Sequence, residues 1–505
     1  MPHRRAVVAL LACCALIGTV DAAAQTPRPP TAPAGRRPAP RPTPAATSPI
    51  GSAALQRDLA TLIRASTTRG AWGVMVVSLT RGDTLFAHNP DALLLPASTM
   101  KLYTSAMALD RFGPAHQFRT EILRDGALSD GTITGNLYLK GAGDPSLSPR
   151  YRNWHDGVSP MDAIADQVYA TGVRRVTGDI VGDASAFQDS RVPDGWLRRY
   201  LQAGYAARVS ALSVNENIAN IVVRSTARGA TVQFEEELYG IPINSTVNVR
   251  EGSRGAWIRV WQDTVAGHFR VHGWIGASSP ERRYRVVVEE PERFAAASFR
   301  AALEKRGIVI DGEVRADPAP GNAERLTAWG SAPLAQLIMT MNGESNNHFA
   351  ELLFRNAART EQDAGSAAAA NEALRAFLES RVGADRNAVF AADGSGLSTH
   401  DRVTAKSMVQ LLSYAQAAPW GEVFATTLPV AGRTETLRTR MRRTPADNNL
   451  RAKTGTTNDV SSLGGYVTTR SGELLAFAFL YNGRDLWRAR STIDAMGVTL
   501  AGFAR

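Results

Sequence analysis

The stretch ALLLPASTMKLYTSAMAL, residues 92–109, is almost entirely apolar, yet it contains a lysine at position 101. The chain has 57 lysine and arginine residues together, and only five of them are lysines. Arginine stays protonated at every working pH, whereas a buried lysine can lose its proton. A lysine kept in apolar surroundings by a chain that otherwise prefers arginine therefore indicates a role for a titratable amine.

Ser98 lies three residues before Lys101, a spacing that places both side chains on one face of a helix. Two interpretations fit this spacing. In one, Lys101 is the base that activates a nucleophilic serine. In the other, Ser98 caps the helix and the Lys101 side chain extends along the surface to water. Because the motif is short, the rest of the chain has to decide between them.

A second lysine stands in Lys453-Thr454-Gly455, which is the only such triplet in the chain. Residues 461–480, SSLGGYVTTRSGELLAFAFL, alternate like a β-hairpin, so the triplet is expected on or beside a sheet edge. The alternative is an ordinary turn at a strand end with a surface lysine.

A third motif, Ser345-Asn346-Asn347, precedes the helical pattern HFAELLFRNAA. Ser-x-Asn is weakly specific, and the chain has another copy at Ser213-Val214-Asn215. We interpret the Ser and Asn of that second copy as turn-forming residues within a strand-like run.

The N-terminus has the pattern of a secretory signal peptide over residues 1–24, with a basic start, a short apolar core and a small-residue cleavage site after Ala24. It predicts an exported, periplasmic protein. Lipid attachment at Cys13 is the second-ranked alternative. The chain has two cysteines, Cys13 and Cys14, so the mature form is expected to have neither disulfides nor thiol chemistry. Residues 25–50, rich in Pro, Ala and Arg, predict an extended tether.

Beyond the tether, helical and strand patterns bracket a long, mostly β middle. Residues 71–89 predict two strands joined by a turn at 81–83, and residues 98–109 predict a helix. Short strands between Gly and Asp turns dominate from about 118 onward. Helical patterns return at 292–307 and from 332, and a last helix is expected from about 486. This predicts one domain, 51–117 plus 325–505, split by a β-rich insertion, 118–324, of two subdomains, one of them near 230–290.

Ser-x-x-Lys, Ser-x-Asn and Lys-Thr-Gly in this order are the motif set of penicillin-recognising serine enzymes. Further segments restrict this resemblance to one family. They are LYLKGAGDPSL, VTGDIVGD, VSALSVNEN, MNGESNNHFAELL, DGSGLS and LPVAG with LRAKTGT. With them, residues 51–505 resemble the class C low-molecular-mass penicillin-binding proteins, the D-alanyl-D-alanine carboxypeptidase/endopeptidase family. The resemblance implies an α/β (α+β) fold, a transpeptidase-like α-β-α sandwich with an antiparallel sheet, interrupted by mostly β inserted domains. It also implies that peptidoglycan stem peptides are the substrates and that β-lactams bind covalently.

The resemblance assigns roles to the three motifs. Ser98 would be the nucleophile and neutral Lys101 its base. Ser345 would relay a proton to the leaving amine, and Asn347 would hold Lys101 and the substrate amide. Substrate contacts around Lys453, which supplies positive charge, are assigned to Thr454, Gly455 and Thr456, and the oxyanion would be bound by the backbone N–H groups of Ser98 and Thr456.

Asp144, in GAGDP, is the candidate for gripping the amino end of a diaminopimelate side chain, with a plain Asp-Pro turn as the alternative. Two positions depart from the family pattern: Arg208 replaces a usual proline, and Glu435 a usual glycine. They affect the predicted geometry of loops and leave the motifs intact.

Other functions are less well supported. A β-lactamase would be more compact, with less chain between Ser98 and Ser345, and a non-catalytic wall-binding scaffold would not be expected to keep all three motifs. DGSGLS around Ser395 lacks the first glycine of a nucleophile elbow. His268 and His272 have no partner at metal-binding spacing, so we expect no metal and no cofactor. Of the formal net charge of +10, residues 1–24 carry +1 and the tether +4, and the modest excess that remains suits anionic partners in general, but no nucleic-acid motif is present. We expect at most peripheral association with the membrane or the wall, and the sequence leaves the oligomeric state open.

Overall fold

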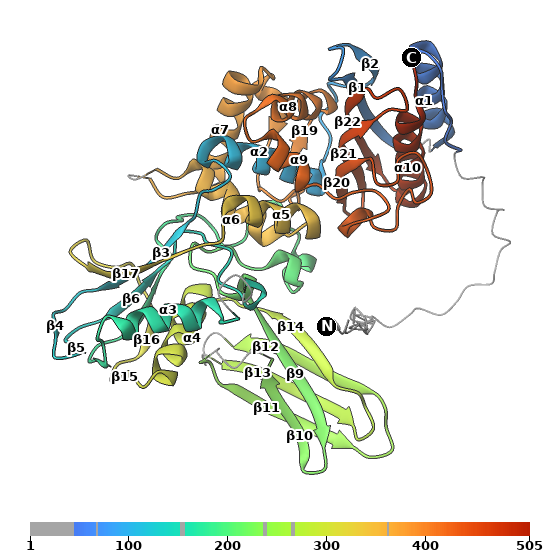
Figure 1. Ribbon diagram of the computed structural model, residues 1–505. Helices are drawn as coiled ribbons and strands as arrows, with labels where there is room; N and C mark the ends of the chain where they lie inside the picture. Colours follow the sequence, from blue (N-terminus) through green and yellow to red (C-terminus); the bar gives the residue numbers. More distant parts are fainter. Residues whose placement is uncertain (1–44, 67–68, 152–156, 236–239, 264–267, 361–362) are drawn as a thin grey trace, which may run out of the picture. The chain divides into compact units, whose positions relative to one another are not determined.

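The computed structural model describes residues 45–66, 69–151, 157–235, 240–263, 268–360 and 363–505 (Figure 1). The predicted signal peptide and tether residues 25–44 lie outside them. All described residues belong to one compact unit, Thr43–Arg505. The end of the predicted tether is part of the fold, because the Thr47 N–H donates to Thr499 Oγ1 at 3.1 Å and Ile50 forms a β-bridge with Ala504. The folded chain therefore begins a few residues earlier than the composition suggests.

A five-stranded sheet joins the two ends of the chain in the order β2-β1-β22-β21-β20. Every neighbouring pair is antiparallel. The strands are β1 (Gly70–Ser78), β2 (Thr84–His88), β20 (Arg451–Thr456), β21 (Val460–Thr468) and β22 (Leu474–Gly483). Both predicted hairpins are confirmed, and β20, which carries the Lys-Thr-Gly motif, is an edge strand as expected.

Helices cover both faces of this sheet (Figure 1). On β22, Phe477 and Phe479 pack in the core shared with α1 (Ser52–Ser66) and α10 (Leu486–Gly502). Ala478 and Leu480, on the opposite face, pack in the core shared with α2 (Met100–Phe112) and α8 (Ala405–Ala417). Alternate residues of a strand thus enter two different cores, as strand geometry requires. The expected α-β-α sandwich is confirmed.

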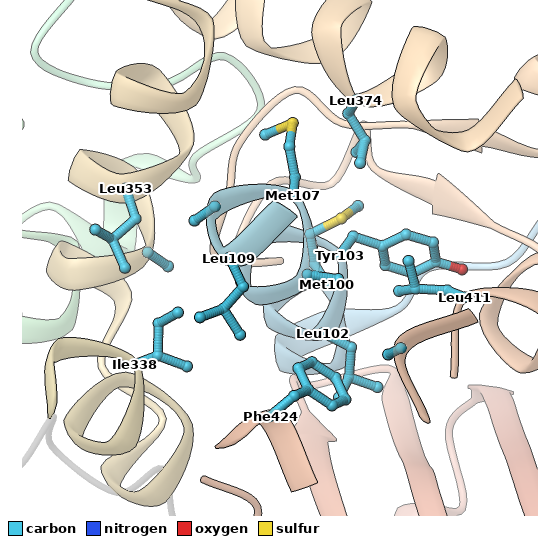
Figure 2. Close-up of a cluster of buried hydrophobic side chains, with 14 of the residues drawn as sticks. Met100, Leu102, Tyr103, Met107, Leu109, Ile338, Leu353, Leu374, Leu411 and Phe424 are labelled. Carbon is cyan, nitrogen blue, oxygen red and sulfur yellow. The ribbon is translucent and has the colours of Figure 1, made fainter. Parts of the chain in front are cut away.

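Helix α2 is surrounded by other helices, and every residue from Met100 to Leu109 is buried. Figure 2 shows its side chains among those of Ile338, Leu353, Leu374, Leu411 and Phe424. These five come from α5 (Leu334–Glu344), α6 (Asn347–Ala358), α7 (Ala367–Phe377), α8 and α9 (Gly421–Thr426). Lys101, which lies on this helix, is fully buried.

The insertion begins with a five-stranded sheet of order β16-β8-β6-β3-β17. Its strands are β3 (Arg119–Arg124), β6 (Leu137–Lys140), β8 (Ile180–Asp183), β16 (Val314–Ala316) and β17 (Glu324–Gly330), with α3 (Pro160–Ala170) and α4 (Pro291–Lys305) in the same core. Strand β17 pairs with β3, so residues 325–330 belong to this sheet and not, as expected, to the segment that returns to the central sheet. Short strands form two smaller sheets: β4 (Leu128–Ser129), β5 (Thr132–Ile133), β7 (Arg175–Val176) and β15 (Val309–Ile310), and β18 (Val389–Phe390) with β19 (Arg402–Val403).

Two three-stranded sheets share one core farther along the insertion (Figure 1). The first has the order β10-β9-β14 and the second β11-β13-β12. The strands are β9 (Ile218–Thr226), β10 (Gly229–Phe234), β11 (Ile243–Arg250), β12 (Ala256–Asp263), β13 (His268–Gly276) and β14 (Arg282–Val287). They begin at residue 218, earlier than the predicted 230. The division of the whole chain into domains stays a prediction.

The strand-like run expected before β9 is a turn. Asn215, Glu216 and Asn217 have φ values of 49°, 58° and 56°, in the left-handed region that a strand never uses. Among the described residues, no helix is long and apolar enough to cross a membrane.

Candidate active site

Lys101 connects its own Ser-x-x-Lys motif to the Ser-x-Asn motif. Its buried Nζ lies 3.1 Å from Ser98 Oγ, 2.7 Å from Asn347 Oδ1 and 2.7 Å from the carbonyl oxygen of Ser395. These partners come from three separate segments of the chain. The side chain therefore does not extend to solvent, and the interpretation of Lys101 as a surface residue is wrong.

Ser98 sits in a strained turn at the start of α2. It lies in a single 3₁₀ turn, Ala97–Thr99, and Ala97 has a φ of 46°, which is unfavourable for a residue with a β-carbon. Gly396 packs directly on this turn, because a β-carbon at position 396 would collide with the carbonyl of Ala97. Ser98 is half-buried while Ala97 and Thr99 are buried, so the turn offers the serine to solvent. Backbone strain of this kind is common at functional sites.

Lys453 connects its own Lys-Thr-Gly motif to the Ser-x-Asn motif. It is buried on β20, and its Nζ donates to Ser345 Oγ at 2.9 Å and to the Thr454 carbonyl at 3.0 Å. Ser345 ends α5 with a left-handed φ of 60°. This conformation turns the chain so that Ser345 faces Lys453 while Asn347, at the start of α6, faces Lys101.

The loop between α5 and α6 is held by the insertion as well. Asn346 caps α6 by accepting from the Phe349 N–H at 3.1 Å, and its Nδ2 donates to Glu216 at 2.8 Å. Asn347 Nδ2 donates to the carbonyl of Tyr205 at 2.9 Å. The inserted segment thus supports the loop that carries the Ser-x-Asn motif.

Gly455 brings the edge strand against the Ser98 turn. A β-carbon at position 455 would lie 2.1 Å from Ser462 Oγ and 2.6 Å from the Pro96 carbonyl oxygen, both closer than van der Waals contact allows, and in a tight contact of 3.1 Å with the Ser98 nitrogen. On the same strand, Thr454 is half-buried and Thr456 is exposed. The glycine of the motif is therefore required for this close approach of β20 to Ser98.

Burial dominates the electrostatics of both lysines. It lowers the pKa of Lys101 to about 7, although the carboxylates of Asp393, Glu351 and Asp401 act in the opposite direction. Burial also lowers the pKa of Lys453 well below its ordinary value, and the nearby charge of Lys101 adds to this effect. An amine of this kind can accept a proton near neutral pH, as a base for Ser98 would have to.

Among the described residues, the structure shows no hydrogen bond between Asp144 and a residue of the three motifs. Its Oδ1 accepts from the Ser146 N–H at 2.7 Å and the Ser146 hydroxyl at 2.6 Å, the pattern of a turn closed by its own side chain. Asp144 is buried, and this burial raises its pKa to about 6. These contacts favour the turn interpretation, and the grip on a diaminopimelate amine stays a prediction.

Sequence reasoning missed several groups around Lys101. Ser395, considered only as a nucleophile in an elbow, is fully buried and contributes its carbonyl oxygen instead. Its turn is tied by Asp393, which accepts from the N–H groups of Ser395 and Gly396 at 3.0 and 2.6 Å. The DGSGLS segment indicates a tight turn, but no sequence pattern shows which backbone carbonyl meets a distant lysine.

The structure shows the contacts of Arg208 and the backbone conformation of Glu435, the two residues that depart from the family pattern. Arg208 forms a bidentate ion pair with Glu289, at 2.7 Å for both bonds, and donates to the carbonyls of Leu201 and Ala206. Glu435 has a φ of 44°, which explains why glycine suits that position. The second Ser-x-Asn copy is part of a turn, as predicted, in which Asn217 Nδ2 donates to Ser213 Oγ at 2.9 Å.

Comparison with known proteins agrees with this geometry. The family model of the D-Ala-D-Ala carboxypeptidase 3 (S13) family matches residues 55–502. The chain is 33% identical to a D-alanyl-D-alanine carboxypeptidase of Actinomadura sp. (strain R39) over 471 residues, 89% of this chain and 85% of that protein. It is 24% identical to the D-alanyl-D-alanine carboxypeptidase DacB of Haemophilus influenzae over 424 residues, 81% of this chain and 85% of that protein.

The solved structures agree on the fold. The crystal structure of penicillin binding protein 4 (dacB) from Haemophilus influenzae matches with a TM-score of 0.73 and 24% identity over 88% of this chain and 98% of that chain. The same protein complexed with a novel β-lactam matches with a TM-score of 0.68. The family model, which matches residues 55–502, covers the central sheet and the insertion alike. The chain therefore belongs to the D-Ala-D-Ala carboxypeptidase 3 (S13) family, and its enzyme class is that of the serine-type D-Ala-D-Ala carboxypeptidases.

Proposed function

We propose that this enzyme acts on the stem peptides of peptidoglycan as a D-alanyl-D-alanine carboxypeptidase and D,D-endopeptidase, through an acyl-enzyme on Ser98, and that β-lactams acylate the same serine. One observation carries the proposal: the buried Nζ of Lys101 lies within hydrogen-bond distance of both Ser98 Oγ and Asn347 Oδ1. A serine and a base that touch, with the base oriented by a third group, are the arrangement that nucleophilic catalysis requires.

In the acylation step, Ser98 Oγ attacks the carbonyl carbon of the penultimate D-Ala while its proton passes to the neutral amine of Lys101. Asn347 and the Ser395 carbonyl hold that amine in place. The carbonyl oxygen becomes an oxyanion, which the backbone N–H groups of Ser98 and Thr456 stabilise in our proposal. The close approach of Gly455 to the Ser98 turn supports this pairing.

Collapse of the tetrahedral intermediate breaks the peptide bond, and the leaving amine takes up the proton that Lys101 accepted from Ser98, so that Lys101 becomes neutral again. Ser345, bonded to Lys453 Nζ at 2.9 Å, is suited to pass this proton on. Burial and the nearby charge of Lys101 lower the pKa of Lys453, and an incoming terminal carboxylate raises this pKa again because opposite charges stabilise each other. Thr454 and Thr456 complete the carboxylate contacts. Water then attacks the ester of Ser98, neutral Lys101 accepts a proton from the water, and Lys101 returns this proton to Ser98 Oγ as the ester bond breaks.

Two features support the assignment of substrate and location. The β-lactam complex of the Haemophilus influenzae protein shows that a relative of this fold accepts such compounds. The N-terminal pattern of this chain fits export, with the mature protein beginning at Gln25 in the periplasm. A lipid-modified Cys13, detected by mass spectrometry of protein from cells, would contradict that location.

Product analysis on defined muropeptides tests the activity. The mature protein should release free D-Ala from a disaccharide pentapeptide and should split a cross-linked dimer into monomers, and Ser98→Ala should do neither. Release of D-Ala without cleavage of the dimer would remove the endopeptidase part of the proposal. No change in either substrate, by a protein that folds and binds penicillin, would contradict the proposal as a whole.

A further inference from the structure

The exposed face of the sheet β11-β13-β12 carries three tryptophans. Trp257 and Trp261 on β12 are 49% and 41% exposed. Trp274 on β13 is directly opposite Trp257 in the strand register and is half-buried. The other face of this sheet packs in the core of the insertion, so these indoles contribute nothing to that core. Several exposed tryptophans on one face indicate a surface that binds a ligand or another macromolecule.

Polar groups able to form hydrogen bonds lie between the indoles. His272 is next to Trp257, with ring centroids 6.0 Å apart, and its Nδ1 lies 2.9 Å from Thr246 Oγ1. Asn244 and Asn248 are exposed on β11 at alternate positions with Thr246 and therefore share its face. A face that mixes flat apolar rings with amide, hydroxyl and imidazole groups matches a ligand with both apolar faces and many hydroxyls.

The charges on this face are mostly positive. Arg259 lies between Trp257 and Trp261 on β12, and the guanidinium of Arg250 lies 4.2 Å from the ring centre of Trp274. Arg270 forms an ion pair with Asp263 at 2.7 Å. The face thus complements a ligand that carries carboxylates in addition to its hydroxyls.

A membrane surface is a poorer match. The exposed positions of β11, β12 and β13 on this face carry no Leu, Ile, Phe or Met within the described strands. Insertion into lipid needs a buried apolar area that two or three indoles separated by arginine and histidine do not supply. Sugar rings need only to stack on the indoles while their hydroxyls bond to the polar neighbours.

We propose that the face of β11-β13-β12 centred on Trp257, Trp261 and His272 binds glycan chains, with acetylated amino-sugar rings stacked on the tryptophans and attached carboxylates near the arginines. Trp257 and Trp261 are four residues apart on one strand, about 13 Å, which is longer than one sugar ring and therefore fits a chain better than a monosaccharide. The identification of the bound glycan as the glycan strand of peptidoglycan rests on the proposed function. The surface would hold the wall polymer while its peptides reach Ser98.

Binding is measured with the Ser98→Ala protein, so that the polymer stays intact. The probes are purified peptidoglycan sacculi in a sedimentation assay and the tetrasaccharide of N-acetylglucosamine in a calorimetric titration. Trp257→Ala and Trp261→Ala should each weaken binding about tenfold, as expected for loss of a central aromatic contact. Trp487→Ala removes a 67% exposed tryptophan on α10 and should change nothing.

The same substitutions are made in the active enzyme as a second readout. Hydrolysis of a small soluble D-Ala-D-Ala peptide should be unchanged, whereas hydrolysis of intact sacculi should fall. Equal binding by the Trp257, Trp261 and wild-type proteins would overturn the proposal. So would binding to phosphatidylglycerol vesicles or single-stranded oligonucleotides with no binding to the glycans. If the wild-type protein hydrolyses no D-Ala-D-Ala peptide but still binds the glycans, the proposed function is refuted and this inference stands.

Discussion

The Nζ of Lys101 and the Oδ1 of Asn347 are 2.7 Å apart, although 246 positions separate them in the chain. Between the two residues, the chain builds the whole insertion and then α5, before α6 begins at Asn347. Asn347 in turn donates to the Tyr205 carbonyl, and Asn346 donates to Glu216, so both asparagines contact the insertion. The orientation of the lysine therefore depends on the insertion as well as on α2.

Replacement of each lysine by arginine separates a proton-accepting role from a purely electrostatic one. Arginine stays charged, so Lys101→Arg should lower the rate of acylation by a penicillin by about 10²- to 10⁴-fold, the usual effect of losing a general base. Lys453→Arg should retain more activity, since part of its role is to attract a carboxylate. Stopped-flow acylation rates, with circular dichroism as a check of folding, distinguish the two. Acylation of a folded Lys101→Arg protein within about threefold of wild type would refute the role of Lys101 as the base.

The pH dependence of acylation should follow Lys101. Its pKa is lowered to about 7 and only the neutral amine accepts a proton, so the acylation rate should rise from about pH 6 and level off above about pH 8. The rise is in this direction because the protonated lysine is the inactive form. A rate constant measured with an uncharged penicillin ester avoids titration of the ligand. A midpoint near the ordinary lysine value of about 10.4 would show that burial does not tune this residue.

Much of this architecture is predictable from the sequence, and the limits have physical causes. Alternation in 461–480 and the apolar period around Lys101 predict the hairpin and α2, because periodicity is a local property. The turn at Ser213–Asn215 was predicted, but its extent was not, because alternating apolar residues around it hide three consecutive left-handed residues, Asn215–Asn217. The pairing of β17 with β3 and the Ser395 carbonyl beside Lys101 are long-range contacts that one sequence does not encode locally.

The motif glycine gives a steric prediction. Gly455→Ala places a β-carbon 2.1 Å from Ser462 Oγ and 2.6 Å from the Pro96 carbonyl oxygen, so β20 should move away from the Ser98 turn. The rate of acylation should fall about 10²-fold, because small displacements of catalytic groups are costly. Gly321→Ala is the matched control, since a β-carbon there meets no atom within 4 Å. If Gly455→Ala acylates like the control, the edge strand does not form the oxyanion site.

Glu435 offers a prediction about stability. Its φ of 44° is strained for any residue with a β-carbon, so Glu435→Gly should raise the free energy of unfolding by about 0.5 kcal/mol, after the larger chain entropy of glycine is counted. Glu435→Ala keeps the β-carbon and should give no such gain. Urea unfolding of the three proteins provides the comparison. Equal stability of the glycine and alanine variants would mean that this backbone conformation costs little.

The site of covalent attachment tests the central claim most directly. Residues 25–505 are labelled with a fluorescent penicillin, digested, and mapped by mass spectrometry. The penicilloyl group should be on Ser98, and the Ser98→Ala protein, folded by circular dichroism, should carry no label. A label on Ser395 or Ser345, or full labelling of Ser98→Ala, would contradict the assignment of Ser98 as the nucleophile.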